Sequence, residues 1–424
     1  MTDSLLVLLD DVVAGSLQRL AGGRLRFDYV EEYREWPGAT PISLSMPLPV
    51  RSHAERSITP WLWGLLPDND AVLARWARHF HVSLSSPFSL LATQIGEDCA
   101  GSVRFVAPDA FDAVPTRSGV TWLTEDEVAE RLRDLRTDAT SWLGRSFTGQ
   151  FSLAGAQAKT ALLYEDGRWG VPSGSRATTH ILKPAVAGLD DHDLNEHLCL
   201  DAARRVGLPA VRTKVMEFAG ESAIVIERYD RRSVDGAILR VHQEDLCQAL
   251  GRAPAQKYQN EGGPGPRDVV ALVRSAMAPS VADDAVRRFV DALIWNWLIA
   301  GTDAHAKNYS LLLAGDQIRL APLYDIASAL PYDTHESKLR FAMKIGGDYR
   351  VATDRNRWPE AARELGLDAD VLVGRVRELA GLAPDAFADA ARVPDVAALH
   401  RPLTSRLVGL VAARTERCRR LVER

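Results

Sequence analysis

Short apolar or alternating stretches open the chain. They cover residues 5–9, 12–20 and 24–30, and a pair of aspartates and a pair of glycines separate them. Alternation with a period of two, broken by turn residues, is typical of short strands joined by tight turns. The first thirty residues are therefore predicted to form a small antiparallel sheet.

Helical patterns follow this sheet. Residues 61–66 read as a helical turn that stops near a proline, and residues 70–80 place apolar side chains on one stripe. We expect residues 1–106 to form a compact N-terminal α+β module. Residues 107–145 are expected to be a helical connector, because Thr124 followed by Glu127 is an N-capping pattern that opens a helix.

The remaining two thirds divide by periodicity. Strand patterns dominate from residue 146 to residue 229, with one helix among them, and helical patterns dominate from residue 230 to residue 424. A strand-rich piece followed by a helix-rich piece favours an α+β fold with two lobes. The prediction is a strand-rich first lobe and an all-helical second lobe.

Composition narrows the class of protein. The 424 residues are 46% hydrophobic and 25% charged, which excludes a disordered or collagen-like chain. The formal net charge of -5 argues against a protein that coats nucleic acid. The 4 cysteines lie far apart without metal-ligand spacing, so they are expected to be reduced core thiols. No apolar run is long enough to span a membrane and no basic signal sequence precedes one, which predicts a cytoplasmic protein.

One polar loop carries most of the candidate chemistry. An apolar helix leads into Asp303 and Asn308, which are five positions apart. Kinase-type phosphoryl transfer needs a carboxylate to accept the proton of the substrate hydroxyl and an amide oxygen to hold magnesium. The spacing predicts that Asp303 is the catalytic base and that Asn308 is a metal ligand.

A predicted hairpin follows the loop. Residues 309–313 and 317–320 are strand-like and flank an Ala-Gly-Asp turn, after which the chain reaches Tyr324 and Asp325. The hairpin is expected to return Asp325 beside Asp303. Two neighbouring buried carboxylates repel each other without a cation, so Mg²⁺ is implied, with Asn308 and Asp325 as its ligands.

Upstream segments could bind a nucleotide. Residues 151–160 combine small residues with Lys159, although they do not match the Walker A pattern. Lys183 ends an apolar strand at the place where kinases carry a phosphate-binding lysine, and Glu196 on the next helix is its candidate ion partner. Residues 227–229 end another apolar strand, where a two-lobed kinase contacts adenine.

Together these motifs resemble the HipA family of serine/threonine kinases, which are toxins of bacterial toxin–antitoxin pairs. The resemblance runs almost from end to end. It rests on the segments 43–48 (SLSMPL), 64–69 (GLLPDN), 96–101 (GEDCAG), 152–157 (SLAGAQ), 180–183 (HILK), 227–230 (ERYD), 242–245 (HQED), 257–258 (KY) with 262–265 (GGPG), 303–308 (DAHAKN) and 323–325 (LYD).

The resemblance implies a two-lobed kinase fold with an N-terminal appendage, and ATP and Mg²⁺ as cofactors. It implies that Asp303 is the base and that Asn308 and Asp325 hold the metal. The residues that it places near ATP are Leu153, Ala154, Gly155, Ala156, Gln157, Ala158, Lys159, Lys183, Glu227, Arg228, Tyr229, His305, Lys307, Asn308, Tyr324 and Asp325.

Regulation and partners are also implied by the resemblance. Ser152 corresponds to the autophosphorylated serine of the family, where added negative charge would repel ATP and expel the loop. The expected partner is a small HipB-like helix-turn-helix antitoxin, and operator DNA would be bound only through it. The expected substrate is a translation-related protein such as an aminoacyl-tRNA synthetase, whose phosphorylation would cause growth arrest and persistence.

Two other functions remain open from the sequence. The same Asp-x-His-x-x-Asn pattern also occurs in phosphatidylinositol kinases, so a small-molecule or lipid kinase is one alternative. A catalytically inactive corepressor that binds the antitoxin is the other. The stretch 396–424 includes Arg401, Arg406, Arg414, Arg417, Arg419 and Arg420, which could face phosphate, although a solvated helix face is the more ordinary interpretation.

Overall fold

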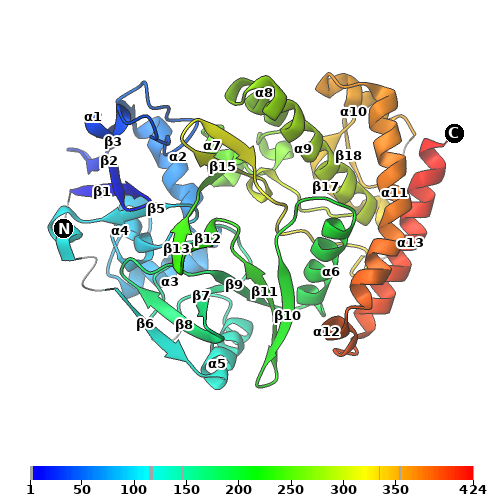
Figure 1. Ribbon diagram of the computed structural model, residues 1–424, viewed down its shortest axis with the longest axis horizontal. Helices are drawn as coiled ribbons and strands as arrows, with labels where there is room; N and C mark the ends of the chain where they lie inside the picture. Colours follow the sequence, from blue (N-terminus) through cyan, green and yellow to red (C-terminus); the bar gives the residue numbers. More distant parts are fainter. Residues whose placement is uncertain (1–2, 114–117, 145–147, 334, 353–354, 424) are drawn as a thin grey trace. The chain divides into compact units, whose positions relative to one another are not determined.

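The computed structural model describes residues 3–113, 118–144, 148–333, 335–352 and 355–423. Parts of the predicted connector (114–117 and 145) and the first residues of the predicted strand-rich lobe (146–147) lie outside the described residues. The chain forms two compact units (Figure 1). Unit 1 comprises Met1–Pro184, Glu217–Ala255 and Ser310–Arg319, and unit 2 comprises Ala185–Met216, Gln256–Tyr309 and Leu320–Arg424.

The predicted N-terminal sheet is present in unit 1. Its five strands have the order β4-β3-β2-β1-β5, and every neighbouring pair is antiparallel. Alternate residues of β1 and β3 point into a core that the helices of the same unit cover. The strand bounds are β1 Ser4–Leu9, β2 Val12–Arg19, β3 Leu25–Tyr29, β4 Ser52–Ala54 and β5 Val103–Val106.

A second sheet of six strands has the order β10-β11-β9-β7-β8-β6. Its bounds are β6 Gly119–Leu123, β7 Thr160–Glu165, β8 Arg168–Ser173, β9 His180–Pro184, β10 Thr213–Phe218 and β11 Glu221–Glu227. Smaller sheets pair β12 with β13 and join β14, β15 and β16 in that order. Their bounds are β12 Arg231–Val234, β13 Ala237–Arg240, β14 His242–Asp245, β15 Ser310–Ala314 and β16 Gln317–Leu320.

The helices of unit 1 are short. Helix α5 begins at the predicted N-cap, where Thr124 and Glu127 form a capping box with the backbone. The Asn69 side chain caps α3 by accepting hydrogen bonds from two backbone amides. The bounds are α1 Glu31–Arg34, α2 Glu55–Leu65, α3 Asp70–His79, α4 Pro87–Leu91, α5 Glu125–Thr137 and α7 Leu246–Ala249.

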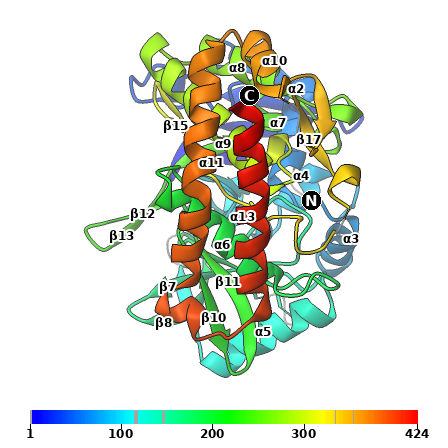
Figure 2. The same ribbon diagram turned by 90° about the vertical axis from the view of Figure 1, so that its right-hand side faces the viewer.

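Unit 2 is mainly helical. Helices α11 and α13 run side by side and pack on α6 and α9 (Figure 2). The bounds are α6 His192–Arg205, α8 Pro266–Ala276, α9 Pro279–Ile299, α10 Arg357–Leu365, α11 Ala369–Ala391, α12 Pro394–Ala397 and α13 Pro402–Val422. One hairpin, β17 (Arg340–Ile345) with β18 (Asp348–Arg350), is added to these helices.

The prediction that residues 230–424 form an all-helical lobe was wrong in part. This stretch also contains strands β12 to β18, and β14 and β15 belong to unit 1. Because β14 pairs with β15, the hairpin that follows the predicted catalytic loop lies in a three-stranded sheet rather than among helices. Each unit is built from separate pieces of the chain. The division into four consecutive domains that the sequence suggested therefore stays a prediction.

Two other expectations have clear outcomes. The four cysteines are free and buried, as predicted. The C-terminal arginines do not form one solvated face: Arg414 is buried and donates to the carbonyls of Trp297 and Val351, and Arg420 pairs with Glu416. Among the described residues, no helix is both long and apolar enough to cross a membrane.

Candidate active site

The predicted catalytic loop begins where α9 ends. Ala300 caps α9 in a left-handed conformation, and Gly301 lies so close to Asn296 that a Cβ atom would be 2.2 Å from the Asn296 amide oxygen. The chain then turns, and Asp303 is exposed. The Tyr258 hydroxyl donates a hydrogen bond of 2.7 Å to Asp303 Oδ1, which holds the carboxylate in one orientation.

Asn308 is oriented by the same loop. Its amide nitrogen donates to the Asp303 carbonyl at 2.8 Å, and its own backbone amide donates to the His305 carbonyl at 2.9 Å. The Asn308 side chain is buried. The hydrogen bond fixes the orientation of the Asn308 side chain, whose amide oxygen is the atom that suits a metal ion.

Three more predicted residues lie in or beside this loop. His305 is buried and packs edge-on against Tyr258, with ring centroids 5.0 Å apart. Lys307 is buried as well, and its carbonyl accepts a 2.8 Å hydrogen bond from the Tyr324 hydroxyl. This bond joins the loop to the segment that carries Asp325.

The Asp325 segment is held by its backbone. Leu323 forms an isolated parallel bridge with Ala210, and both backbone hydrogen bonds of this bridge are present. Asp325 has a φ of 57°, a left-handed conformation that aspartate adopts more readily than most residues. Unit 2 therefore contains Asp303, Asn308 and Asp325 on one loop and one anchored segment.

A groove in unit 2 opens at Asp303. Its volume is about 590 Å³, and its walls are Tyr258 and Asn260, the residues Thr302 and Asp303, and the β17–β18 hairpin. The exposed carboxylate of Asp303 thus faces a space that could receive part of a substrate.

The predicted phosphate loop lies in unit 1, where hydrogen bonds of the buried side chains of Ser152 and Lys159 hold it. The Ser152 side chain is fully buried and donates to the Leu65 carbonyl at 2.8 Å. Lys159 is also buried, donates to the Ala154 carbonyl at 2.6 Å and lies over the Trp142 ring. The loop is compact because its lysine folds back on its own backbone.

The junction between α2 and α3 also holds this loop. The Asp68 amide donates to the Gly155 carbonyl at 3.0 Å, and the Asn69 amide nitrogen donates to the Ala156 carbonyl at 3.3 Å. Gly155 has a φ of 101°, and a Cβ atom there would lie 2.6 Å from Lys159 Nζ. The segment 64–69, noted only as part of the family resemblance, therefore has a local role in positioning the loop.

Lys183 and Glu196 fall in different units. Lys183 is buried on β9, opposite Ile224 of β11. Glu196 is buried on α6, and its neighbour Asn195 exchanges two hydrogen bonds with Ser328. The predicted pair between Lys183 and Glu196 stays a prediction.

The three residues predicted to contact adenine have unlike environments. Glu227 is exposed at the end of β11, and the Tyr229 hydroxyl bonds the Gln243 side chain. Arg228 is buried, and its guanidinium donates to Asp230 at 3.0 and 2.8 Å. The Arg228 side chain is therefore committed to structure, and its backbone amide donates to the Thr179 carbonyl at 2.9 Å.

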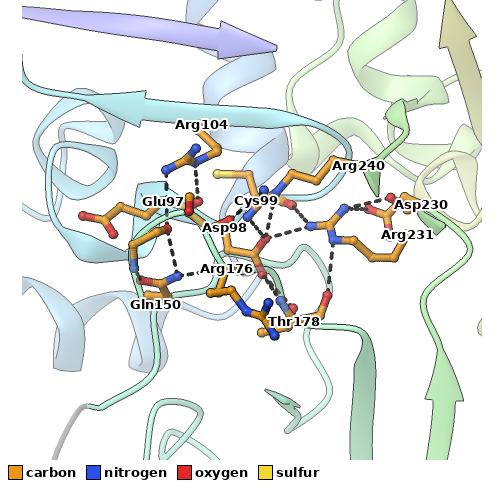
Figure 3. Close-up of polar contacts among 12 residues, drawn as sticks. Glu97, Asp98, Cys99, Arg104, Gln150, Arg176, Thr178, Asp230, Arg231 and Arg240 are labelled. Carbon is orange, nitrogen blue, oxygen red and sulfur yellow. Dashed lines mark hydrogen bonds and ion pairs between the residues drawn. The ribbon is translucent and has the colours of Figure 1, made fainter. Parts of the chain in front are cut away.

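Sequence reasoning missed a cluster of buried ion pairs that is centred on Asp98 (Figure 3). Asp98 is fully buried, and its carboxylate contacts Arg231 at 2.8 Å and Arg228 and Arg240 at 3.4 Å. Burial alone would raise the pKa of Asp98, but the three guanidiniums together hold it below its ordinary value. The Thr178 hydroxyl adds a 2.7 Å hydrogen bond.

This cluster connects to the phosphate loop. The Asp98 carbonyl accepts a hydrogen bond of 3.0 Å from the Ser152 amide, and Cys99 forms a bridge with Ser152. The buried ion pairs thereby fix the backbone on which Ser152 lies. The only signals in the sequence were the segments 96–101 and 227–230, whose pairing across the chain could not be derived from either segment alone.

The fold and the loop define the class as an α+β protein with a kinase-like fold. The HipA-like C-terminal domain family matches residues 151–387, more than half of the chain, and the HipA N-terminal domain family matches residues 5–106. The chain belongs to the HipA family.

Individual relatives agree with this assignment. A Sinorhizobium fredii protein named "Putative kinase Y4mE" is 32% identical over 89% of this chain and 90% of its own length. The serine/threonine-protein kinase toxin HipA of Shewanella oneidensis is 28% identical over 87% of this chain and 86% of its own length. A solved Shewanella oneidensis complex of HipA, HipB and operator DNA contains a chain that matches the fold with a TM-score of 0.82 and 24% identity, over 99% of this chain and 98% of that one.

Proposed function

We propose that the protein is an ATP-dependent serine/threonine protein kinase. The observation that carries this proposal is the loop of unit 2, in which Asp303 is exposed at a groove and oriented by Tyr258. Asn308 is fixed through its amide nitrogen by the same loop. Relatives over most of the chain are named as kinases, which supports the same activity.

In the proposed reaction, the substrate hydroxyl enters the groove and donates a hydrogen bond to Asp303. Its oxygen attacks the γ-phosphorus of ATP, the bond from that phosphorus to the bridging oxygen breaks, and ADP leaves with that electron pair. The hydroxyl proton passes to the Asp303 carboxylate and then to solvent. Tyr258 donates to Asp303 Oδ1, so the carboxylate is already oriented and need not reorganise during transfer.

ATP and Mg²⁺ are the proposed cofactors. Asn308 and Asp325 offer oxygen donors, and magnesium in kinases takes one or two such protein ligands and completes its shell with phosphates and water. Among the described residues, no group of three or more His, Cys, Asp and Glu side chains could hold a metal by itself. The ion would neutralise charge on the phosphates.

The predicted nucleotide contacts become part of the same proposal. In unit 1, the loop 153–159 and Lys183 would bind the phosphates of ATP. Residues 227–229 would contact its adenine. In unit 2, His305, Lys307 and Tyr324 would shape the surroundings of the catalytic loop, since all three contact or belong to it.

Ser152 is the proposed autophosphorylation site. Its hydroxyl is buried and bonded to the Leu65 carbonyl, so it cannot accept phosphate until this segment leaves its place. A phosphate of about two negative charges could not return to a buried position without a cation, and the loop would stay displaced. Incubation with ATP and Mg²⁺ should therefore add one phosphate to the parent and none to Ser152→Ala, as read by intact mass.

We further propose that the protein is the cytoplasmic toxin of a toxin–antitoxin pair, with a HipB-like helix-turn-helix antitoxin as its partner and an aminoacyl-tRNA synthetase as a candidate target. Growth arrest and persistence would follow. Brief induction of the parent and of Asp303→Asn, followed by phosphoproteomics, tests this role. A phosphosite that appears only with the parent supports it. Arrest of equal strength by both forms would instead favour the inactive corepressor, and phosphorylation of a lipid or metabolite alone would favour the small-molecule kinase.

A further inference from the structure

A second cavity in unit 2 is larger than the groove at Asp303. Its volume is about 710 Å³, and its walls come from α8, from the C-terminal end of α10 and from the β17–β18 hairpin. Helices α8 and α10 lie close together in Figure 2. We call this cavity the α8–α10 pocket. None of the residues proposed to bind ATP, metal or the substrate hydroxyl lines it.

Basic side chains dominate the charge of the pocket. They are Arg267 and Arg274 on α8, Lys344 on β17 and Arg363 on α10. The three arginines are exposed, and none of the four cations forms an ion pair with a described residue. Arg267 and Arg274 are seven positions apart, so both lie on one face of α8.

The acidic side chains of the pocket compensate only part of this charge. Asp268 is used locally, because its carboxylate accepts a 2.8 Å hydrogen bond from the Gly265 amide and completes the cap of α8. Glu364 is exposed. Four cations against two acids leave an excess of two positive charges facing one cavity. Such a surface is complementary to a ligand with several negative charges.

The pocket shares its walls with the groove at Asp303. The β17–β18 hairpin lines both cavities, and so does the segment 258–260, with Tyr258 and Asn260 in the groove and Gln259 in the pocket. Gln259 accepts a 2.7 Å hydrogen bond from the Lys344 amide, which ties the two walls together. The two cavities are therefore built on the same two wall elements, the β17–β18 hairpin and the segment 258–260.

We propose that the α8–α10 pocket is a docking site for an acidic segment of the protein substrate, while the acceptor serine or threonine of the same substrate lies at Asp303. This proposal rests on the proposed kinase function. A polypeptide fits better than a nucleic acid for two reasons. None of the described residues that line the pocket is aromatic, so a base could not stack there, and the charge of the pocket is a local excess rather than a stripe that follows a backbone.

Binding of two peptides without ATP tests the site independently of catalysis. Both carry one serine, and one has four glutamates beside it where the other has four glutamines. The parent should bind the acidic peptide at least about tenfold more tightly, and added salt should weaken this binding. The double variant Arg267→Gln with Arg274→Gln should bind the acidic peptide about tenfold more weakly than the parent, because two exposed ion pairs with the peptide are lost.

A matched control removes two charges elsewhere in unit 2. Arg406→Gln with Lys338→Gln changes exposed cations outside the pocket and should bind the acidic peptide within twofold of the parent. If the pocket variant melts at a lower temperature than this control, Arg363→Gln on α10 replaces it.

Three results would overturn the docking site. They are equal binding of both peptides, unchanged affinity in the pocket variant, and binding of a single-stranded RNA oligonucleotide that depends on Arg267 and Arg274 when the acidic peptide does not bind. Absence of phosphate transfer to any protein would overturn the kinase function instead, so the two failures are distinguishable.

Discussion

Replacing Glu244 by glutamine should remove a pH-dependent contribution to the stability of unit 1. Glu244 lies on β14 and is 1% exposed. Its Oε1 accepts a 2.8 Å hydrogen bond from the Leu44 amide, and its Oε2 lies 2.6 Å from Ser43 Oγ. Burial without a cation raises the pKa of Glu244 from 4.5 to about 8.

The sign of the effect follows from the two pKa values. The folded carboxyl keeps its proton up to about pH 8, whereas the unfolded carboxyl loses its proton near pH 4.5. The contribution of this group is therefore complete below pH 4.5 and is lost as the pH rises through 8. With about 1.4 kcal/mol for each pKa unit, the free energy of unfolding should fall by about 1.4 kcal/mol between roughly pH 7 and pH 9.

The assay is urea unfolding at these two pH values. Glu244→Gln keeps one oxygen acceptor and one donor, as in the protonated acid, so its free energy of unfolding should lack this decrease. Glu32→Gln, which changes an exposed acid of the same unit, should behave like the parent. An equal loss of stability in the parent and in Glu244→Gln would refute the reasoning about the buried carboxyl.

Three further predictions concern the loop and its supports. Asp98→Asn should destabilise unit 1 by about 3–5 kcal/mol in urea unfolding, because it leaves three buried guanidiniums without their shared carboxylate; a loss as small as that of an exposed charge would contradict the cluster. Gly155→Ala should weaken nucleotide binding measured by calorimetry, because its φ of 101° is strained for alanine and the new Cβ would meet Lys159 Nζ. Tyr258→Phe should lower kcat about tenfold with little change in nucleotide affinity, since the ring stays in place and the hydrogen bond to Asp303 is lost, and unchanged kcat would remove its positioning role.

Local elements could be predicted well from the sequence. The strands β1, β2 and β3 follow period-two patterns, and α5 begins at the predicted Thr124 cap. The hairpin of β15 and β16 was also expected. These features depend on neighbours in the chain, so pattern and capping chemistry are sufficient to indicate them.

Long-range partners could not be predicted in this way. Nothing near Asp98 in the sequence indicates that it contacts Arg231 and Arg240, and nothing near Asp303 indicates Tyr258 as its partner. Arg414 looked like part of a surface stripe but is buried against the Trp297 carbonyl. Such contacts depend on how distant segments fold together, and the periodicity of the sequence does not predict this.

The central claim is that the Asp303 carboxylate accepts the hydroxyl proton during transfer of phosphate from ATP. The most direct measurement compares phosphate incorporation from γ-labelled ATP by the parent and by Asp303→Asn, alongside nucleotide affinity. Loss of the general base should reduce the rate by about 10²- to 10⁴-fold and leave nucleotide affinity within a few-fold of the parent. Phosphate transfer by Asp303→Asn at the rate of the parent would contradict the account.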